Sequence, residues 1–238
     1  MKVLVSLILL FSIQAEAKLF KNSYVSFELP ERWNCNLEGT EWVCQSTDQV
    51  SSKQAIIILT AKEVGPSDSL ALYDSYLKKA KSSVAKDGKP FLSQVKNVTQ
   101  RKIADQEWVD GLHLGSEIPS FYTRYLATVK RTIAILVTFS AHKQHFTKYS
   151  PDFLRAIGSL RVTATADLLN SPSGQPGIRG AGGSLGSTIA GAFPDDMMLD
   201  EGEIPAEPKG SGNTGKLLAL LSLALVILGG YYFYSKKS

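Results

Sequence analysis

The feature that most constrains this chain is an apolar segment near its end. Residues 217–234 read LLALLSLALVILGGYYFY and contain no charged side chain. A helix rises about 1.5 Å per residue, so the segment reaches roughly 27 Å, close to the hydrocarbon thickness of a bilayer. Tyrosines at its end and the two lysines after it are typical of a cytoplasmic membrane boundary. The sequence therefore predicts a transmembrane helix over residues 216–235 and a cytoplasmic stub over residues 236–238.

The opening residues have the three parts of a secretory signal peptide. Lys2 is followed by an apolar stretch over residues 3–13, and Ala15 and Ala17 form a small-residue cleavage site. The apolar stretch is too short to span a bilayer. We expect residues 1–17 to be removed, and an uncleaved anchor is the alternative. Both ends then place the rest of the chain on the periplasmic or extracellular side of a cell membrane, held by a single span.

Charge and composition divide the exported chain into a domain and a linker. Residues 18–163 hold 20 Lys and Arg against 14 Asp and Glu, whereas residues 164–215 hold two against seven. The second stretch also contains 11 of the 19 glycines and 5 of the 10 prolines. Such a segment buries too little apolar surface to offset its chain entropy. It predicts a disordered, acidic linker, in which residues 185–199 are either plain spacer or a short docking motif.

Two cysteines lie nine residues apart in a predicted hairpin. Trp33 to Cys35 and Trp42 to Cys44 flank a turn that contains Gly39. Because disulfides persist in oxidising compartments, Cys35 and Cys44 are expected to form one. A redox-active pair is the alternative. Catalytic dithiols usually occur as C-x-x-C at a helix N-terminus, and this spacing differs from that pattern.

The remaining periodicity predicts an α+β fold. A helix is expected after the cap Ser67, with its apolar face continuing to Val84, and a second helix is expected from Pro151 after the cap Ser150. The expected strands cover residues 23–29, 54–64, 94–103, 106–116, 121–129, 132–141 and 158–162. The links between the four strands of residues 94–141 are too short for parallel crossovers. The sequence therefore predicts a curved antiparallel sheet with packed helices, followed by the disordered linker and the transmembrane helix.

The order of these elements resembles PsbP-like domains. The resemblance begins at Tyr24-Val-Ser-Phe-Glu-Leu-Pro30-Glu-Arg-Trp33, an extended strand followed by Pro-x-x-Trp, and continues to the Ser-Leu-Arg161 after the last helix. It covers residues 24–162. The disulfide hairpin and the membrane tail depart from the family. The resemblance implies a non-catalytic accessory or assembly module, and it transfers no ligand residues to this chain.

Catalytic and metal-binding patterns are sparse. The sequence contains no H-E-x-x-H or Walker motif. A G-x-S-x-G string at residues 182–186 and a G-x-G-x-x-G string at residues 210–215 lie in the glycine-rich predicted linker, where no strand is expected to precede them. His142 and His145 are spaced for one face of a helix start, but a zinc site needs further ligands, and only Asp152 lies nearby in the sequence. His113 lies in a predicted strand and could act as an acid or base. We predict no catalytic residues, no metal and no cofactor.

These observations favour a membrane-anchored extracytoplasmic interaction or assembly module with an envelope protein as its partner. Nucleic-acid binding fits poorly because the basic residues are dispersed and the domain is expected to be exported. One alternative is an anchored hydrolase that uses His113 or the pair His142 and His145. Another is a surface protein processed near Thr214-Gly215, although the Leu-Pro of sorting signals is missing there.

Overall fold

The computed structural model describes residues 18–85, 88–170 and 176–179. The predicted signal peptide, the later part of the predicted linker, the site near Thr214-Gly215 and the predicted transmembrane helix lie outside these residues. Among the described residues, no helix combines the length and apolarity needed to cross a membrane.

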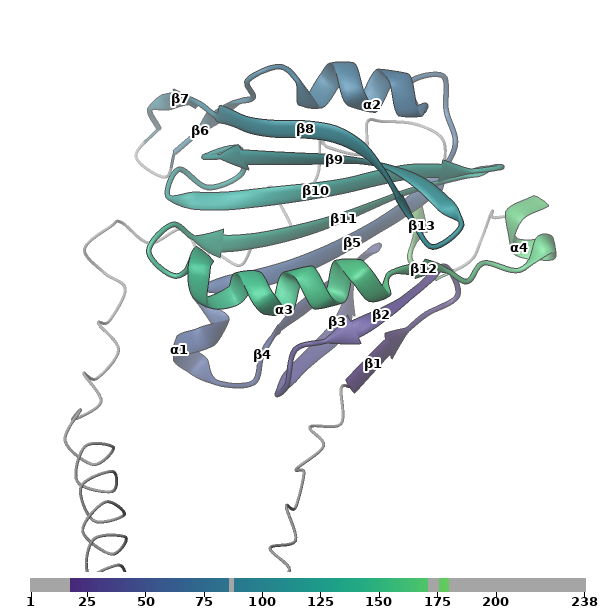
Figure 1. Cartoon of the computed structure of the whole chain (residues 1–238), viewed down its shortest axis with the longest axis horizontal. Helices are drawn as coiled ribbons and strands as arrows, with labels where there is room; N and C mark the ends of the chain where they lie inside the picture. Colours follow the sequence, from purple (N-terminus) through teal and green to yellow (C-terminus); the bar gives the residue numbers. More distant parts are fainter. Residues whose placement is uncertain (1–17, 86–87, 171–175, 180–238) are drawn as a thin grey trace, which may run out of the picture. The chain divides into compact units, whose positions relative to one another are not determined.

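A large, mostly antiparallel sheet forms the centre of the domain (Figure 1). Its strands follow the order β3 (Trp33–Glu38), β4 (Glu41–Ser46), β5 (Ala55–Glu63), β11 (Ile133–His142), β10 (Phe121–Lys130), β9 (Gln106–Leu114) and β8 (Gln94–Ile103). The short β13 (Ile178–Arg179) pairs in parallel with the end of β5. The predicted meander is confirmed, since β8, β9, β10 and β11 pair in succession.

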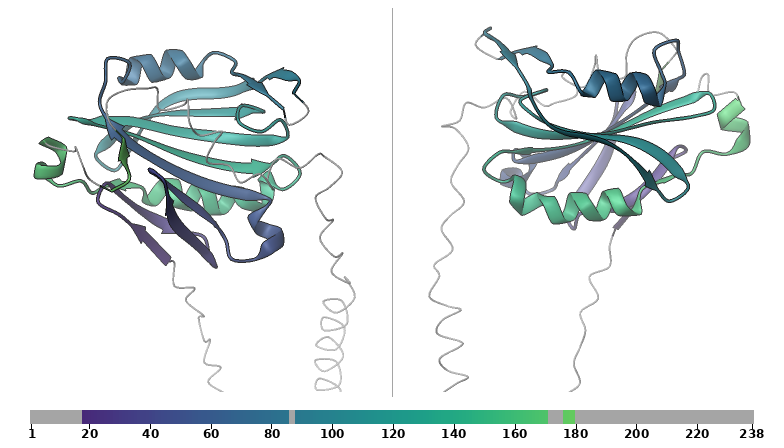
Figure 2. Two further views of the ribbon diagram at one scale, coloured as in Figure 1. Left: turned by 180° about the vertical axis from the view of Figure 1, so that it is seen from behind. Right: turned by 45° about the horizontal axis from the view of Figure 1, so that its top comes forward.

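Two smaller sheets and four helices complete the described fold. The second sheet joins β1 (Lys18–Lys21), β2 (Val25–Leu29) and β12 (Arg161–Val162), and a hairpin joins β6 (Ser82–Val84) to β7 (Pro90–Leu92). The helices are α1 (Gln49–Ser52), α2 (Leu70–Leu77), α3 (Phe146–Ser159) and α4 (Ala166–Asn170). Figure 2 shows α2 on one face of the large sheet and α3 on the other. The fold is therefore α+β, as the sequence predicts.

The core has a layer on each face of the large sheet. On the α3 side, Phe139 of β11 packs against Phe153 of α3, within a cluster that also includes Phe27 of β2. On the α2 side, Tyr73 and Leu77 join a separate cluster from β4, β5, β9, β10 and β11. All ten residues of β11 are buried because this strand lies inside the sheet and contributes to both layers. A continuous apolar run of this kind is typical of a strand that is covered on both faces.

Helix α2 is shorter than its apolar spacing suggests. Its N-cap is Ser69, whose hydroxyl accepts from the Leu72 amide, and not Ser67. The helix ends at Leu77 because the backbone of Lys81 bonds to Ser93 rather than to the preceding helical turn. The Lys81 amide donates to the Ser93 hydroxyl and the Ser93 amide donates to the Lys81 carbonyl, and these two bonds join the ends of the β6–β7 hairpin. The predicted helical continuation to Val84 is thus wrong. A pairing between distant residues overrides a local helical pattern here.

Helix α3 begins earlier than predicted. It starts at Phe146, so Pro151 lies inside the helix and Ser150 donates to the Phe146 carbonyl rather than capping the helix. Proline lacks the amide that would bond one turn back, which usually disfavours an interior position. The helix persists because Tyr149 and Phe153, one turn apart on its buried face, pack into the core.

The folded domain extends beyond residue 163. The predicted linker starts at residue 164, but α4 lies in this segment and its Leu168 and Leu169 are buried in the core. Further along, the Tyr24 hydroxyl donates to the Pro176 carbonyl, just before β13. These few apolar residues hardly change the average composition of residues 164–215, so composition did not reveal them. They are enough to hold the first part of the segment on the domain.

Candidate functional site

Cys35 and Cys44 form the predicted disulfide. They are directly opposite in the β3–β4 hairpin, with Cα atoms 4.0 Å apart. Cys44 is fully buried and belongs to the core layer on the α3 side. A partner thiol could not reach its sulfur without opening the core. The geometry therefore fits a structural cross-link better than a redox-active pair.

His113 lies at the end of β9, beneath the C-terminus of α2, and is completely buried. Its Nε2 is 2.8 Å from the Leu77 carbonyl and its Nδ1 is 3.0 Å from the Ser93 hydroxyl. Ser93 accepts from the Lys81 amide, so it donates to Nδ1, and Nε2–H donates to Leu77. Burial lowers the pKa of His113 and keeps it neutral. The ring links β9 to the end of α2 and to Ser93, the residue that follows β7, and both of its nitrogens are hydrogen-bonded.

His142 and His145 do not share a helix. His142 is the last residue of β11, whereas His145 is the N-cap position of α3, and their ring centroids are 5.9 Å apart. Asp152, the third ligand considered from the sequence, forms an ion pair with Arg155 at 3.6 Å. The described residues contain no group of three or more histidine, cysteine or acidic side chains placed to hold a metal ion.

A cluster of ionisable groups that the sequence did not indicate lies in the loop between β9 and β10. The hydroxyl of Tyr125 bonds to the Glu117 carboxylate and lies 2.7 Å from Ser116 Oγ. Loss of hydration raises the pKa of Glu117 to about 7, and the negative charge of Glu41 adds to the rise. Lys81 opposes it. The pKa of Lys81 itself falls to about 8, mainly through burial.

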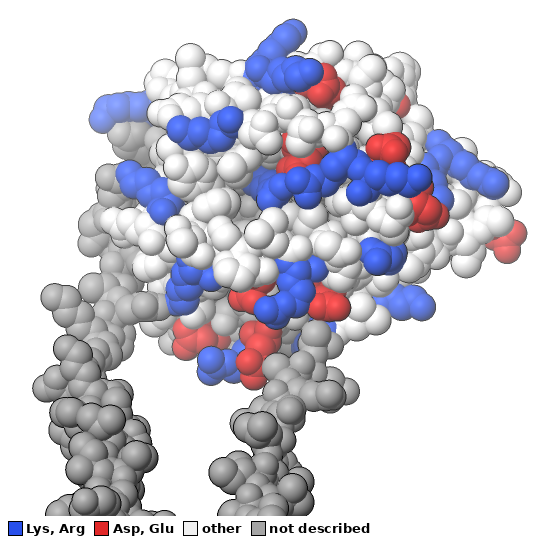
Figure 3. Space-filling model, in the orientation of Figure 1, with Lys and Arg blue, Asp and Glu red and all other residues white. Residues whose placement is uncertain are grey.

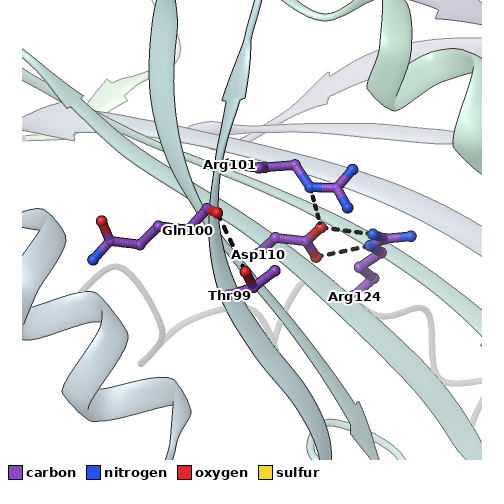
Figure 4. Close-up of polar contacts among 5 residues, drawn as sticks. All are labelled: Thr99, Gln100, Arg101, Asp110 and Arg124. Carbon is purple, nitrogen blue, oxygen red and sulfur yellow. Dashed lines mark hydrogen bonds and ion pairs between the residues drawn. The ribbon is translucent and has the colours of Figure 1, made fainter.

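A second cluster is formed by three charged residues on neighbouring strands (Figure 4). Asp110 of β9 accepts from Arg124 of β10 at two positions, Nε at 2.8 Å and Nη2 at 2.6 Å. Arg101 of β8 places its Nε 2.8 Å from the same carboxylate. Asp110 is only 3% exposed, whereas the Arg101 side chain is 39% exposed. We call this group the arginine cluster. It holds two cations on one buried anion, and Arg101 is the more exposed of the two, since the Arg124 side chain is only 20% exposed.

Figure 4 shows that Arg101 contacts Asp110 through its Nε, and it also shows a local bond from the Thr99 hydroxyl to the Gln100 carbonyl at 3.2 Å. A band of basic side chains, with acidic ones beside it, crosses the face of the domain seen in Figure 3. Arginine presents five N–H donors in a planar fork, which suits carboxylate and phosphate groups. Chemically, the arginine cluster can therefore bind an anion.

An open hollow of about 400 Å³ adjoins Arg101. One wall is the end of β8 and the turn after it, and the other is the C-terminal part of α3, with Leu154, Ile157 and Gly158. A second hollow, of about 500 Å³, lies between the β1–β2 turn and α4. Neither of these two hollows is lined by His113, His142 or His145.

The sequence contained a signal for the arginine cluster. Asp110 shares its strand face with Trp108, since side chains alternate along a strand, and Trp108 belongs to the core. A carboxylate at such a position requires a cationic partner. Asp105 and Glu107, which also lie near the 104–105 turn, are exposed, so solvent compensates their charges. Asp110, in contrast, is buried and depends on the arginines.

Comparisons with known proteins give similarity at the level of the backbone. No family model matches the chain, and no curated protein matches it. The solution structure of cyanobacterial PsbP (CyanoP) from Synechocystis sp. PCC 6803 is similar with a TM-score of 0.43 and 11% identity, covering 63% of this chain and 95% of that one. It belongs to the family that the sequence resembles.

Two further solved structures show similarity of the same order. LpqN of Mycobacterium tuberculosis, involved in cell envelope biogenesis, gives a TM-score of 0.41 and 8% identity, covering 63% of this chain and 87% of that one. The Ran-binding protein Mog1p of Saccharomyces cerevisiae gives 0.40 and 8%, covering 60% and 92%. At these scores and identities the likeness supports no inference about function, so the function must be argued from the residues themselves.

Proposed function

We propose that this domain is a non-catalytic interaction module that is tethered to a membrane on its extracytoplasmic side and recognises an acidic region of an envelope protein. The observation that carries the proposal is the arginine cluster. Arg101 and Arg124 together bring two positive charges to one buried carboxylate, so the cluster keeps a net positive charge at the surface.

Asp110 prepares the two arginines for binding. A long side chain normally loses rotamer freedom when it binds, which costs affinity. Here the carboxylate already holds Arg124 at two nitrogens and forms an ion pair with the Nε of Arg101. The exposed N–H groups of Arg101 can then bind a carboxylate ligand with a smaller loss of rotamer freedom. The predicted histidines contrast with this arrangement, because His113 is fully engaged inside the domain and His142 is buried.

The extracytoplasmic location remains a prediction from the two terminal segments. The Cys35–Cys44 disulfide supports it, because such bonds are rare in reducing compartments. Protease added outside intact spheroplasts should degrade the domain. Protection of the domain, with loss of only the last residues, would contradict this location.

The binding function is tested by crosslinking the full chain in cells of its source and recovering it with its partner. Arg101→Gln removes one cation while Arg124 continues to pair with Asp110, so the buried carboxylate stays compensated. Lys21→Gln, on the exposed end of β1, is the matched control. We expect Arg101→Gln to reduce recovery of the partner about tenfold and Lys21→Gln to leave it unchanged. Equal recovery with both variants would refute the proposal.

One observation favours the alternative of an anchored hydrolase. Glu117 and Lys81, with pKa values of about 7 and about 8, could exchange protons near neutral pH. Such an enzyme would use this pair rather than His113, His142 or His145. Hydrolysis of a panel of ester and amide substrates by the purified chain, lost on Glu117→Gln, would establish the alternative.

A further inference from the structure

We infer that strand β8 binds an extended, acidic segment of the partner as an additional strand of the large sheet. The inference rests on the proposed interaction function and specifies the partner's chemistry. The segment carries an acidic residue and an apolar residue two positions apart. Three features of the described residues support this mode: the edge of β8, the hollow beside it, and the residues on its α3-facing side.

β8 is the terminal strand of the large sheet in the described part of the chain, and its pairing partner there is β9. In an antiparallel ladder alternate residues direct their backbone N–H and C=O groups away from the neighbour. These groups on β8 therefore line an edge. Extended peptides bind to such edges through main-chain hydrogen bonds, and side-chain contacts set the specificity.

The two halves of β8 differ. A bulge lies between Val95 and Asn97, so Lys96 has no opposing residue in β9. Bulges and edge lysines commonly prevent a strand from pairing with another chain. From Asn97 to Ile103 the register is regular. Pairing is therefore blocked at the start of β8 and permitted along its second half.

The hollow beside β8 lies along this regular half. It is lined by the consecutive residues from Thr99 to Ala104, whose side chains point alternately to the two faces of the sheet. A hollow on one face of the sheet would be lined only by every second residue of the strand. A hollow lined by successive residues runs along the edge of the sheet. The opposite wall is apolar, and its Leu154 is 53% exposed. The hollow thus offers backbone groups on one side and an apolar surface on the other.

The side chains of β8 define what an added strand must carry. Thr99, Arg101 and Ile103 share the face toward α3, where Asp110 orients Arg101. A peptide residue on this face beside Arg101 meets exposed N–H donors and is best satisfied by a carboxylate. The residue two positions along reaches Leu154, so it is apolar. Lys102, on the opposite face, adds attraction for negative charge.

Gly158 offers a way to block the hollow without disturbing the core. A Cβ added to this glycine of α3 meets no heavy atom within 4 Å, yet Gly158 lines the hollow. Leucine has a much better helix propensity than glycine. Gly158→Leu should therefore fold normally and place its side chain where the peptide would lie.

The test measures binding of a synthetic peptide of about eight residues, in which threonine alternates with glutamate and leucine, to the purified full chain by fluorescence anisotropy. Arg101→Gln and Gly158→Leu should each weaken binding at least tenfold, and the control Lys21→Gln less than twofold. Two further peptides are methylated at every second amide nitrogen, one at the odd and one at the even positions. Only one of them should lose binding, because only one set of amides faces the edge of β8. Thermal unfolding of each variant confirms that it is folded.

Several results would overturn strand addition: no binding of the peptide, equal binding of both methylated forms and the parent, or unchanged binding by Gly158→Leu. The cellular crosslinking assay separates this inference from the proposed function. If Arg101→Gln loses the partner and Gly158→Leu retains it, the interaction function stands and strand addition is wrong. If neither variant loses the partner, both are wrong. Loss with both variants, together with the peptide result, supports both.

Discussion

The raised pKa of Glu117 predicts that Glu117→Gln stabilises the domain at neutral pH and above. In the folded domain this pKa rises from 4.5 to about 7, so folding favours the protonated, uncharged form. In the unfolded chain the carboxyl ionises near its usual value. The folded state therefore binds more protons between these two pKa values, and stability falls as the pH rises through that window. Glutamine cannot ionise and lacks this loss.

The size of the effect follows from the two pKa values. Ionisation of Glu117 costs the wild-type domain about 1 kcal/mol of unfolding free energy near pH 5 and about 3 kcal/mol near pH 7.5. Glutamine has nearly the same shape, and its carbonyl can accept the Tyr125 hydroxyl bond that Glu117 accepts. The advantage of Glu117→Gln over wild type should therefore grow by about 2 kcal/mol across this range.

Urea unfolding of both proteins, measured from about pH 5 to about pH 7.5, provides the test. His113 titrates with the opposite sign, because its lowered pKa means that stability is lost as the pH falls through its unfolded value. Taking the difference between the two proteins cancels this contribution. A difference that stays constant with pH would show that Glu117 is ionised normally in the folded domain, and the reasoning from burial would fail.

Three further predictions concern stability and are measured by urea unfolding. Replacing Cys35 and Cys44 together by serine should cost about 2–3 kcal/mol, and added reductant should then have no further effect; an unchanged midpoint would show that the cross-link adds nothing. Ser69→Ala should cost about 1 kcal/mol and Ser67→Ala almost nothing, whereas the reverse order would restore the cap inferred from the sequence. Lys62→Met should cost about 3–5 kcal/mol because it leaves a buried aspartate without its cation, and a loss below about 1 kcal/mol would contradict that pairing.

The long strands of the large sheet were predictable because their signals are local. Apolar residues alternate along them, and the connections at residues 104–105 and 130–132 are too short for anything but antiparallel neighbours. The cysteine pair was predictable for the same reason, since a hairpin register brings Cys35 opposite Cys44. Where secondary structure depends on contacts within about ten residues, the alternation of apolar residues and the residues of the turns were sufficient to predict it.

Helix ends and the domain boundary depend on contacts between distant residues. The end of α2 is set by the bonds between Lys81 and Ser93, which no local pattern around Leu77 contains. Similarly, α4 is held because Leu168 and Leu169 enter a core formed by other elements. Such contacts cannot be obtained from helical periodicity or from average composition.

The arginine cluster could not be predicted from the sequence as readily as the fold. His113 is an internal link between elements of the domain, whereas Arg101 and Arg124 pair with the buried carboxylate of Asp110 and are partly exposed. Their association depends on the register of three strands, with Arg101 and Asp110 on adjacent strands and Arg124 on the third. Because Asp110 lies two residues from Trp108, the sequence indicates that its carboxylate is buried and needs a cationic partner. The register of β8, β9 and β10 determines which arginines provide that cation.

The small size of β13 has a mechanical consequence. Tension applied through the chain beyond Arg179 reaches the sheet first at two residue pairs, Ile178 with Ala61 and Arg179 with Lys62. So few hydrogen bonds should detach at low force, before the buried leucines of α4 are pulled from the core. The domain could then lengthen under strain without unfolding its sheet, and single-molecule stretching would register this as a small, early extension.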